Sequence, residues 1–509
     1  VEAPSGSRFQ SQVSTLQASV QAVMVEPLPH LLGAVSGPAT ISALERPKVP
    51  LPEPTLHKAV VTEPSHAETG IKQLVGIQLL YAMAIAISVP AFPFVWTVTP
   101  LADGDDVRGG SLHSYGVTVN AACELLSASL LGTLSDHFGR KPFLLAASVG
   151  QVIDFTVAGL AARGGKDCGL SLPHSHIWLF LARGLAGLCG NMMVFSKACV
   201  GDVSSPEQRA RNFALLGSTI GIAFVIGPAV GAGLAAIHLQ VPLLVSAGLS
   251  VVSLSWICCL KETLRQKDVV ALHWRRANPF GALQFLYSTT FLRLFGAMSF
   301  LDQLALTVVS TIFLQYLKVA FGVDREKATS VLVVFGLGQG ISCVLILPPL
   351  VRRLGEASTL KLGYVLTTFA FACMGAASNI RVFWLMYPIV ICFALGAISN
   401  PVQIAIGSNC VDGNAQGKLQ AACGSLDVVG KMIGASIVSL VWEPTTRAGQ
   451  PGAIWWLACA AMGPGVWIAF RLARSLPPRF QHPCDEGGNV GTRSPQIGGT
   501  VNDGGQSEI

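Results

Sequence analysis

Six ionisable residues inside apolar segments are the side chains of this sequence whose types and positions could do chemistry. An unpaired charge in such a segment is unfavourable by about 2.5–3.5 kcal/mol on insertion scales, so each residue needs a partner or a function. A carboxyl group in apolar surroundings favours its protonated form, which lets it bind and release a proton. The chemistry indicated is proton or ion binding, at Glu124, Asp154, Arg183, Asp302, Asp427 and Lys431.

Glu124 is the strongest candidate for a proton carrier among these six residues. Asn120 and Ser127 lie at helical spacing from Glu124 and would make one face of its helix polar. Arg183 stays charged in any setting, so it could stabilise the ionised form of Glu124 or hold an anionic solute.

The remaining charges allow both a structural and a functional interpretation. Asp427 and Lys431 stand four residues apart, and this spacing predicts an ion pair along one helix. Asp154 lies one helical turn from Gln151 and is an alternative proton carrier. A purely structural role, in which the buried charges neutralise one another and fix helix packing, stays open for Glu124 as well.

The composition predicts that these residues lie in an all-α integral membrane protein. The chain has 509 residues, of which 51% are hydrophobic and 12% are charged. Soluble domains carry about 25% charged residues, and apolar runs of about 20 residues indicate membrane-spanning helices. The net charge of +6 is attributed to loops at the cytoplasmic surface, and no nucleic-acid partner is expected.

Twelve spans are predicted in two six-helix halves, 71–260 and 291–475, on either side of a charged cytoplasmic loop at 261–290. Residues 1–70 are rich in proline and are predicted to form a disordered cytoplasmic tail, and residues 476–509 form a second tail. Loops after even-numbered spans carry more lysine and arginine, which places both termini in the cytoplasm. The spans are expected near 72–96, 113–134, 142–162, 176–200, 210–237, 242–260, 291–316, 328–350, 359–379, 382–408, 414–441 and 453–472.

The sequence contains neither a C-x-x-C pair nor the phosphate-binding pattern G-x-x-x-x-G-K-[ST]. We therefore expect no metal site, no cofactor and no ATP hydrolysis within this chain. The histidines are scattered and form no catalytic constellation with other residues, so an enzyme is not expected. The expected partners are a small-molecule substrate, protons as a coupling ion and the lipid bilayer, and the chain is expected to be a monomer.

A tight charged turn, G-T-L-S-D-H-F-G-R-K, joins the second and third predicted spans. Gly132 is expected to let the two helices approach closely, and Gly139 to supply the backbone freedom of a short turn. Asp136, Arg140 and Lys141 place charges at the water boundary, where they could pair and unpair as helices move. The stretch resembles the loop G-x-x-x-D-x-x-G-R-[RK] of the major facilitator superfamily at every fixed position. A charged turn that merely anchors topology is the alternative.

Span 5 carries a second resemblance, to the glycine-rich antiporter motif of the drug-efflux branch of that superfamily. The matching residues are Gly217, Gly221, Gly227, Pro228 and Gly231, while alanines replace three of the family's glycines. Close helix packing and prevention of leak are both compatible with this pattern. The stretch K-E-T-L after span 6 is similar to the P-E-T-L of tetracycline-efflux-like members.

The resemblance implies a transporter whose two halves alternate access to a substrate site near the bilayer midplane. In this family span 7 commonly lines the cavity, so Asp302 could contact a cation or the substrate. Proton-coupled export of a small organic solute is the expectation. One departure is that Tyr81 stands in span 1 where related exporters often have an aspartate. An uncoupled facilitator or organic-anion transporter, and a transport-dead receptor or scaffold, remain as alternatives.

Overall fold

The computed structural model describes residues 64–162, 174–204, 206–264, 283–411 and 416–476. All of them belong to one of the two units into which the chain divides, residues 61–509. The predictions made for residues 1–63, for 265–282 within the central loop and for the tail at 477–509 concern segments outside the described residues.

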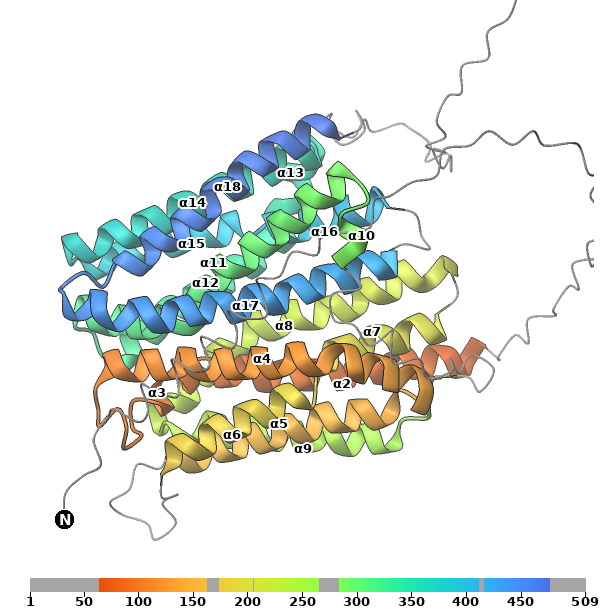
Figure 1. Ribbon diagram of the computed structural model, residues 1–509, viewed down its shortest axis with the longest axis horizontal. Coiled ribbons are helices and arrows are strands. Elements are labelled where there is room, and N and C mark those ends of the chain that lie inside the picture. Colours follow the sequence, from red (N-terminus) through yellow and green to blue (C-terminus); the bar gives the residue numbers. More distant parts are fainter. Residues whose placement is uncertain (1–63, 163–173, 205, 265–282, 412–415, 477–509) are drawn as a thin grey trace, which may run out of the picture. The chain divides into compact units, whose positions relative to one another are not determined.

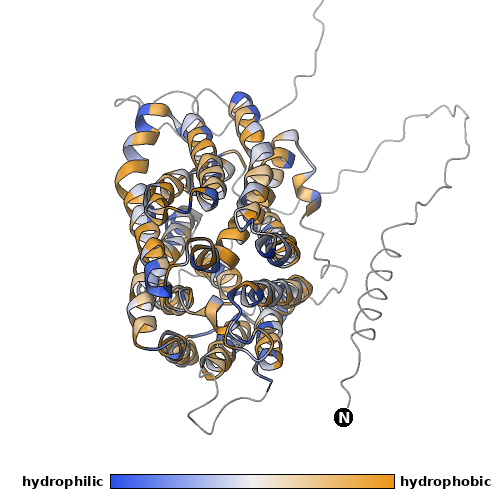
Figure 2. Ribbon diagram, turned by 90° about the vertical axis from the view of Figure 1, so that its left-hand side faces the viewer, coloured by the Kyte–Doolittle hydropathy of each residue, from blue (hydrophilic) through white to orange (hydrophobic). Residues whose placement is uncertain are grey.

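Twelve stretches of the described residues are long and apolar enough to cross a membrane, and this confirms the predicted fold class. Hydrophobic residues predominate along these helices when they are viewed end-on (Figure 2). The first half comprises α2 (Pro64–Ser88), α3 (Phe92–Val95), α4 (Asp106–Phe138), α5 (Lys141–Ala161), α6 (Ser175–Leu188), α7 (Met192–Val203), α8 (Pro206–Ile237) and α9 (Gln240–Cys259).

The second half begins with the short helix α10 and ends with α18 (Figure 1). It comprises α10 (Leu283–Leu286), α11 (Thr290–Phe321), α12 (Arg325–Ile341), the π-helical turn η3 (Ser342–Ile346), α13 (Leu347–Leu354), α14 (Glu356–Ile380), the 3-10 turn η4 (Phe383–Leu385), α15 (Met386–Gly396), α16 (Ser399–Asn409), α17 (Gln416–Arg447) and α18 (Ala453–Ser475).

The first span differs from its prediction at both ends. Helix α2 begins at Pro64, inside the segment expected to be a tail, and ends at Ser88 rather than continuing to residue 96. Pro90 explains the early end, because it has no N–H to donate and disfavours helical backbone at the residue before it. The chain then forms the separate buried turn α3.

Spans 4 and 10 were also predicted as single helices, and both are broken. In span 4, Gly190 has a φ of +84° between α6 and α7. The Asn191 side chain then accepts a hydrogen bond from the Met193 N–H at 2.9 Å, which caps α7. A glycine followed by a capping asparagine is the local signal for this break, and the apolar run around it concealed that signal. In span 10, α15 ends at Gly396 and α16 begins at Ser399.

The helices pack within and between the halves. In the first half α2 contacts α8, α5 contacts α9 and α4 contacts α6, while in the second α11 contacts α17 and α14 contacts α18. The halves meet where α4 lies beside α17 (Figure 1) and where α8 contacts α12.

The glycines of α8 divide into two groups according to their surroundings. At Gly227 and Gly231 a Cβ atom would clash with Ala86 and Ile87 of α2, so these two glycines are needed for close packing. Gly217 and Gly221 have open space where a Cβ would be, and packing does not explain them. Pro228 lies inside the continuous helix α8.

This difference predicts a contrast between two valine substitutions in α8. Gly231→Val places a branched side chain against the Ile87 carbonyl of α2, whereas Gly233→Val extends into open space and serves as the matched control. Overpacking typically lowers stability by about 1–3 kcal/mol, so we expect the thermal midpoint to fall for Gly231→Val relative to the control. Equal midpoints in detergent-purified protein would show that α2 and α8 do not pack this closely.

Candidate functional site

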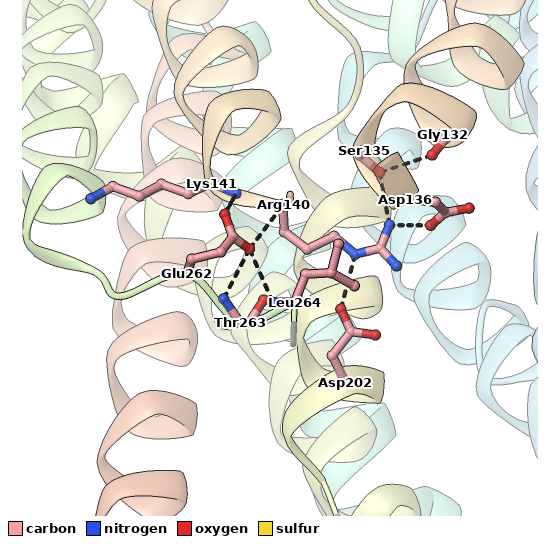
Figure 3. Close-up of polar contacts among 9 residues, drawn as sticks. All are labelled: Gly132, Ser135, Asp136, Arg140, Lys141, Asp202, Glu262, Thr263 and Leu264. Atoms are coloured by element: carbon pink, nitrogen blue, oxygen red, sulfur yellow. Dashed lines mark hydrogen bonds and ion pairs between the residues drawn. The ribbon is translucent and has the colours of Figure 1, made fainter. Parts of the chain in front are cut away.

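The turn between α4 and α5 is organised around Arg140, whose side chain is only 11% exposed (Figure 3). Its Nη1 lies 2.5 Å from Asp136 Oδ1 and 2.8 Å from Ser135 Oγ. Its Nε lies 2.9 Å from Oδ2 of Asp202, near the end of α7. Two carboxylates thus share one guanidinium, so Arg140 can lose one partner and keep a charge-assisted bond to the other.

Glu262, which follows α9, holds the other side of the same turn. Its carboxylate accepts hydrogen bonds from the backbone N–H groups of Arg140 at 2.9 Å, Lys141 at 3.0 Å, Thr263 at 2.9 Å and Leu264 at 3.0 Å (Figure 3). Burial raises the pKa of Glu262, but these four donors outweigh it and lower the pKa below its ordinary 4.5. The end of the sixth span is thereby tied to the start of the third.

The two glycines of the turn have different roles from one another. Gly139 has a φ of +100°, and a Cβ there would lie 2.6 Å from Glu262 Oε2, so both backbone conformation and space require glycine. The expectation that Gly132 allows close helix approach is wrong, because no described atom of a neighbouring helix lies within 4 Å of the position of its Cβ. Lys141 lies at the first turn of α5 and donates from Nζ to the Cys258 carbonyl at 2.7 Å.

Glu124 lies near the middle of α4, where residues from both halves meet. Its Oε1 accepts a hydrogen bond from Asn191 Nδ2 at 3.0 Å, at the break between α6 and α7. Its Oε2 lies 3.4 Å from Nζ of Lys431, which comes from α17 in the second half. The same Nζ lies 3.1 Å from Asn120 Oδ1. An ion pair near the middle of the membrane therefore joins the halves.

The prediction that Lys431 pairs with Asp427 along one helix is wrong. Among the described residues, the carboxylate within 4 Å of the Lys431 Nζ is that of Glu124. An i,i+4 pair contributes only about 0.2–0.5 kcal/mol, whereas a buried carboxylate left without a partner is unfavourable by several kcal/mol. The lysine is long enough to reach Glu124 on the neighbouring helix, and neutralising that carboxylate stabilises the protein more than a pair along α17 would.

Asp154 and Arg183 form a second buried pair within the first half. Arg183 Nη1 lies 3.2 Å from Asp154 Oδ2, and the Arg183 guanidinium carbon lies 3.9 Å above the centre of the Phe92 ring. One interpretation of the sequence had Arg183 stabilise the ionised form of Glu124. In the structure Arg183 pairs with Asp154 instead. Asn120 Nδ2 donates to the Arg183 carbonyl at 3.1 Å, which connects the two pairs.

A third group of charges includes Lys197, which the sequence analysis missed. Lys197 of α7 lies within electrostatic range of Asp427 of α17, and Asp427 lies within range of Asp302 of α11. Asn400 of α16 lies close to the Asp302 carboxyl. The signal for Lys197 was present, because it is an ionisable residue in an apolar segment, like the six residues selected. Asp202 and Glu262 carried no such signal, because both lie near helix ends, but Glu262 is the glutamate of the K-E-T-L stretch noted in the sequence.

Ion pairs and a hydrogen bond join the halves at the opposite end of α4 from the Arg140 turn. Arg447 Nη2 lies 2.6 Å from Asp105 Oδ2, and Lys318 Nζ lies 2.7 Å from Asp106 Oδ2. Next to these ion pairs, Trp442 Nε1 donates a hydrogen bond to the backbone carbonyl of Val107 at 3.0 Å. Burial raises the pKa of Asp105, but hydrogen bonds from Arg447 and from backbone N–H groups outweigh it and lower the pKa. These contacts hold the two halves together at the end of α4 away from the Arg140 turn.

Comparison with known proteins gives matches over most of the chain. The family model described as Major Facilitator Superfamily matches residues 74–435. The class C tetracycline resistance protein of Escherichia coli is 28% identical over 416 residues, which cover 77% of this chain and 96% of that protein. The hippocampus abundant transcript 1 protein of Mus musculus is 26% identical over 311 residues, which cover 59% of this chain and 60% of that protein.

Solved structures share the fold at low sequence identity. A D-xylose-proton symporter has a TM-score of 0.64 and 14% identity, with coverage of 82% of this chain and 100% of that chain. The human organic anion transporter MFSD10 has a TM-score of 0.59 and 18% identity, with coverage of 79% of this chain and 99% of that chain.

The lowered pKa of Glu262 predicts how its contribution to stability depends on pH. A carboxylate with a depressed pKa stabilises the fold above its unfolded pKa of about 4.5, and this stability is lost as the pH falls through the folded value. Glu262→Gln should therefore lower the thermal midpoint at pH 7, and the difference from wild type should shrink below pH 4.5.

Glu326→Gln is the matched control, because Glu326 is an exposed acid in the first turn of α12. Glu326→Gln should leave the thermal midpoint near that of wild type both at pH 7 and below pH 4.5. A Glu262→Gln deficit that is constant from pH 7 to pH 4 would show that the charge of Glu262 does not matter.

Proposed function

Because the chain belongs to the Major Facilitator Superfamily, we propose that it exports a small organic solute in exchange for protons by alternating access. That the protein is a multi-pass membrane transporter rather than an enzyme follows from the family and the twelve spans. The relatives named for tetracycline resistance support a small organic molecule as cargo and support export.

The ion pair between Glu124 and Lys431 is the observation that carries the proton-coupled mechanism. It joins α4 of one half to α17 of the other. A proton on Glu124 removes the negative charge, so the attraction that holds the two helices together at this level is lost. Movement of the halves then no longer requires separation of two opposite charges in a medium of low polarity. Binding of a proton thereby lowers the barrier to reorientation.

An uncoupled transporter of organic anions is the second candidate, and the same lysine favours it. When Glu124 is not its partner, Lys431 presents an ammonium group beside Asn120, and an anionic solute could take the place of the carboxylate. Tyr81, where related exporters often carry an acid, fits this candidate too. A transport-dead scaffold is disfavoured by the exchangeable charge pairs around Arg140, which a static protein would not need.

The proposed topology has the Arg140 turn and both chain termini in the cytoplasm. The segments at 1–70 and 476–509 are then cytoplasmic tails, and 261–290 is a cytoplasmic loop between the halves. The pairs Asp105–Arg447 and Asp106–Lys318 consequently close the side away from the cytoplasm. We further propose that a single chain is the transporting unit, since its two halves together bring Glu124 and Lys431 into contact.

Transport in sealed vesicles tests the role of Glu124. Glu124→Gln resembles the protonated residue, so it should lower pH-driven accumulation on the order of ten-fold or more while leaving solute exchange in place. A panel of organic cations, anions and neutral drugs, with and without a pH gradient, identifies the solute. Asp154→Asn, Asp302→Asn and Asp427→Asn are the comparison variants.

The outcomes distinguish the candidates. If Glu124→Gln keeps full pH-driven accumulation of solute and one comparison variant loses it, the residue changed in that variant is the proton site. Anion uptake that ignores the pH gradient and is lost in Lys431→Gln supports the uncoupled transporter. No solute movement by wild type across the whole panel, in protein shown to be folded, supports a scaffold.

The ion pair between Lys318 and Asp106, which we propose closes the side away from the cytoplasm, gives a separate prediction about alternating access. Lys318→Asp places two carboxylates together at Asp106, which should disfavour the closed arrangement by about 1 kcal/mol and slow transport about five-fold. The double variant Asp106→Lys/Lys318→Asp restores the attraction and should recover the rate. Lys327→Asp, at a nearby exposed position, is the control. If the double variant is as slow as the single one, this ion pair does not form the closure.

A further inference from the structure

The last two turns of α18 present an aromatic and basic face away from the protein. Trp467, Phe470, Arg471 and Arg474 stand at positions i, i+3, i+4 and i+7, so they share one side of the helix, and all four are exposed. Trp467 is 57% exposed and Phe470 is 43% exposed. The residues between them, such as Leu472, are buried against the bundle. We call the four exposed residues the α18 basic face.

The α18 basic face is shaped by contacts between its cations and its rings. The guanidinium carbon of Arg471 lies 5.2 Å from the centre of the Trp467 ring. Lys361 Nζ, from α14, lies 5.6 Å from the centre of the Phe470 ring. The four residues of the face line a surface pocket of about 320 Å³. Arg471 and Arg474 therefore line the pocket together with the two rings, and Lys361 lies against the Phe470 ring beside it.

Three cations therefore gather at one place, and the described part of the chain supplies no compensating acid there. Among the described residues, Lys361, Arg471 and Arg474 have no carboxylate within 4 Å and no side-chain hydrogen bond. Two positive charges in the lining of the pocket and a third beside it attract an anion.

The membrane level of the pocket follows from the order of the spans. Helix α18 is the twelfth span and therefore ends on the same side as the second span, α4, which leads into the Arg140 turn. The face occupies the last turns of α18, whose helix ends at Ser475. Aromatic side chains of this kind lie at the boundary of acyl chains and headgroups, and cations one or two turns further lie among the phosphates.

We propose that the α18 basic face, together with Lys361, binds the phosphate headgroup of an anionic phospholipid in the leaflet on the side of the Arg140 turn. The guanidinium groups of Arg471 and Arg474 match the geometry of phosphate oxygens, and Lys361 adds a third positive charge. Trp467 and Phe470 pack against the glycerol backbone and the first part of the acyl chains. Charge that served only to anchor topology would need neither the pocket nor the contacts between cations and rings.

Lipid binding to the purified full-length chain, measured by native mass spectrometry from zwitterionic micelles, tests this site. Titration with phosphatidylglycerol should give saturable binding, and phosphatidylcholine should bind more weakly. Arg471→Gln/Arg474→Gln should lower the affinity for phosphatidylglycerol on the order of ten-fold or more, and should leave phosphatidylcholine binding unchanged. Arg471→Lys/Arg474→Lys keeps the charge and should recover part of the affinity.

Arg211→Gln/Lys261→Gln is the matched control, because it removes two exposed cations from the same side of the membrane in the first half. It should bind phosphatidylglycerol as wild type does. Equal binding by the Arg471→Gln/Arg474→Gln variant and wild type, or an equal loss in the control, overturns the proposal. Displacement of the lipid by millimolar glycerol phosphate would assign the pocket to a soluble anion instead. Thermal unfolding of each variant confirms that it is folded, and none of these outcomes depends on transport.

Discussion

A charge inside the membrane requires an opposite charge or a hydrogen-bonding partner close by, and this requirement organises the interior of the protein. Glu124 and Asp154 face different cations, and Asn120 connects the two pairs through separate atoms of one amide. The Asp154 pair lies within the first half and can persist in any arrangement of the halves. The Glu124 pair spans both halves, so it must change when they move. The same electrostatic rule thus yields one structural pair and one that depends on conformation.

The Arg140 turn meets a different constraint, because it lies where water can reach the charges. Pairs whose carboxylates are partly exposed, as those of Asp136 and Asp202 are, contribute little individually, and stability there comes from shared partners and from backbone hydrogen bonds. Glu262 supplies the latter, since its carboxylate satisfies N–H groups at the start of α5 that would otherwise lack partners. The turn is consequently fixed at its backbone, while the carboxylates around Arg140 remain exchangeable.

The sequence was sufficient to predict the twelve spans and the charged turn, because apolar length and a local motif are properties of contiguous residues. It was not sufficient to pair the charges. Lys431 was assigned to Asp427 by helical spacing, but its partner Glu124 lies about 300 residues away along the chain, and only packing brings the two together. The breaks at Pro90 and Gly190 had local signals that hydrophobicity outweighed. Gly132 fitted the motif, yet its surroundings are open.

Helix α7 acquires a particular importance from what stands at its two ends. Asn191 caps its start and at the same time donates to Glu124, while Asp202 near its last turn holds Arg140. About eleven residues of helix separate these positions, a rigid strut roughly 16 Å long. A strut cannot shorten without losing backbone hydrogen bonds, so a displacement of one end along the axis reaches the other undiminished. The Glu124 pair and the Arg140 turn are therefore linked by one helix, and a shift of either along the axis of α7 must be accompanied by a shift of the other.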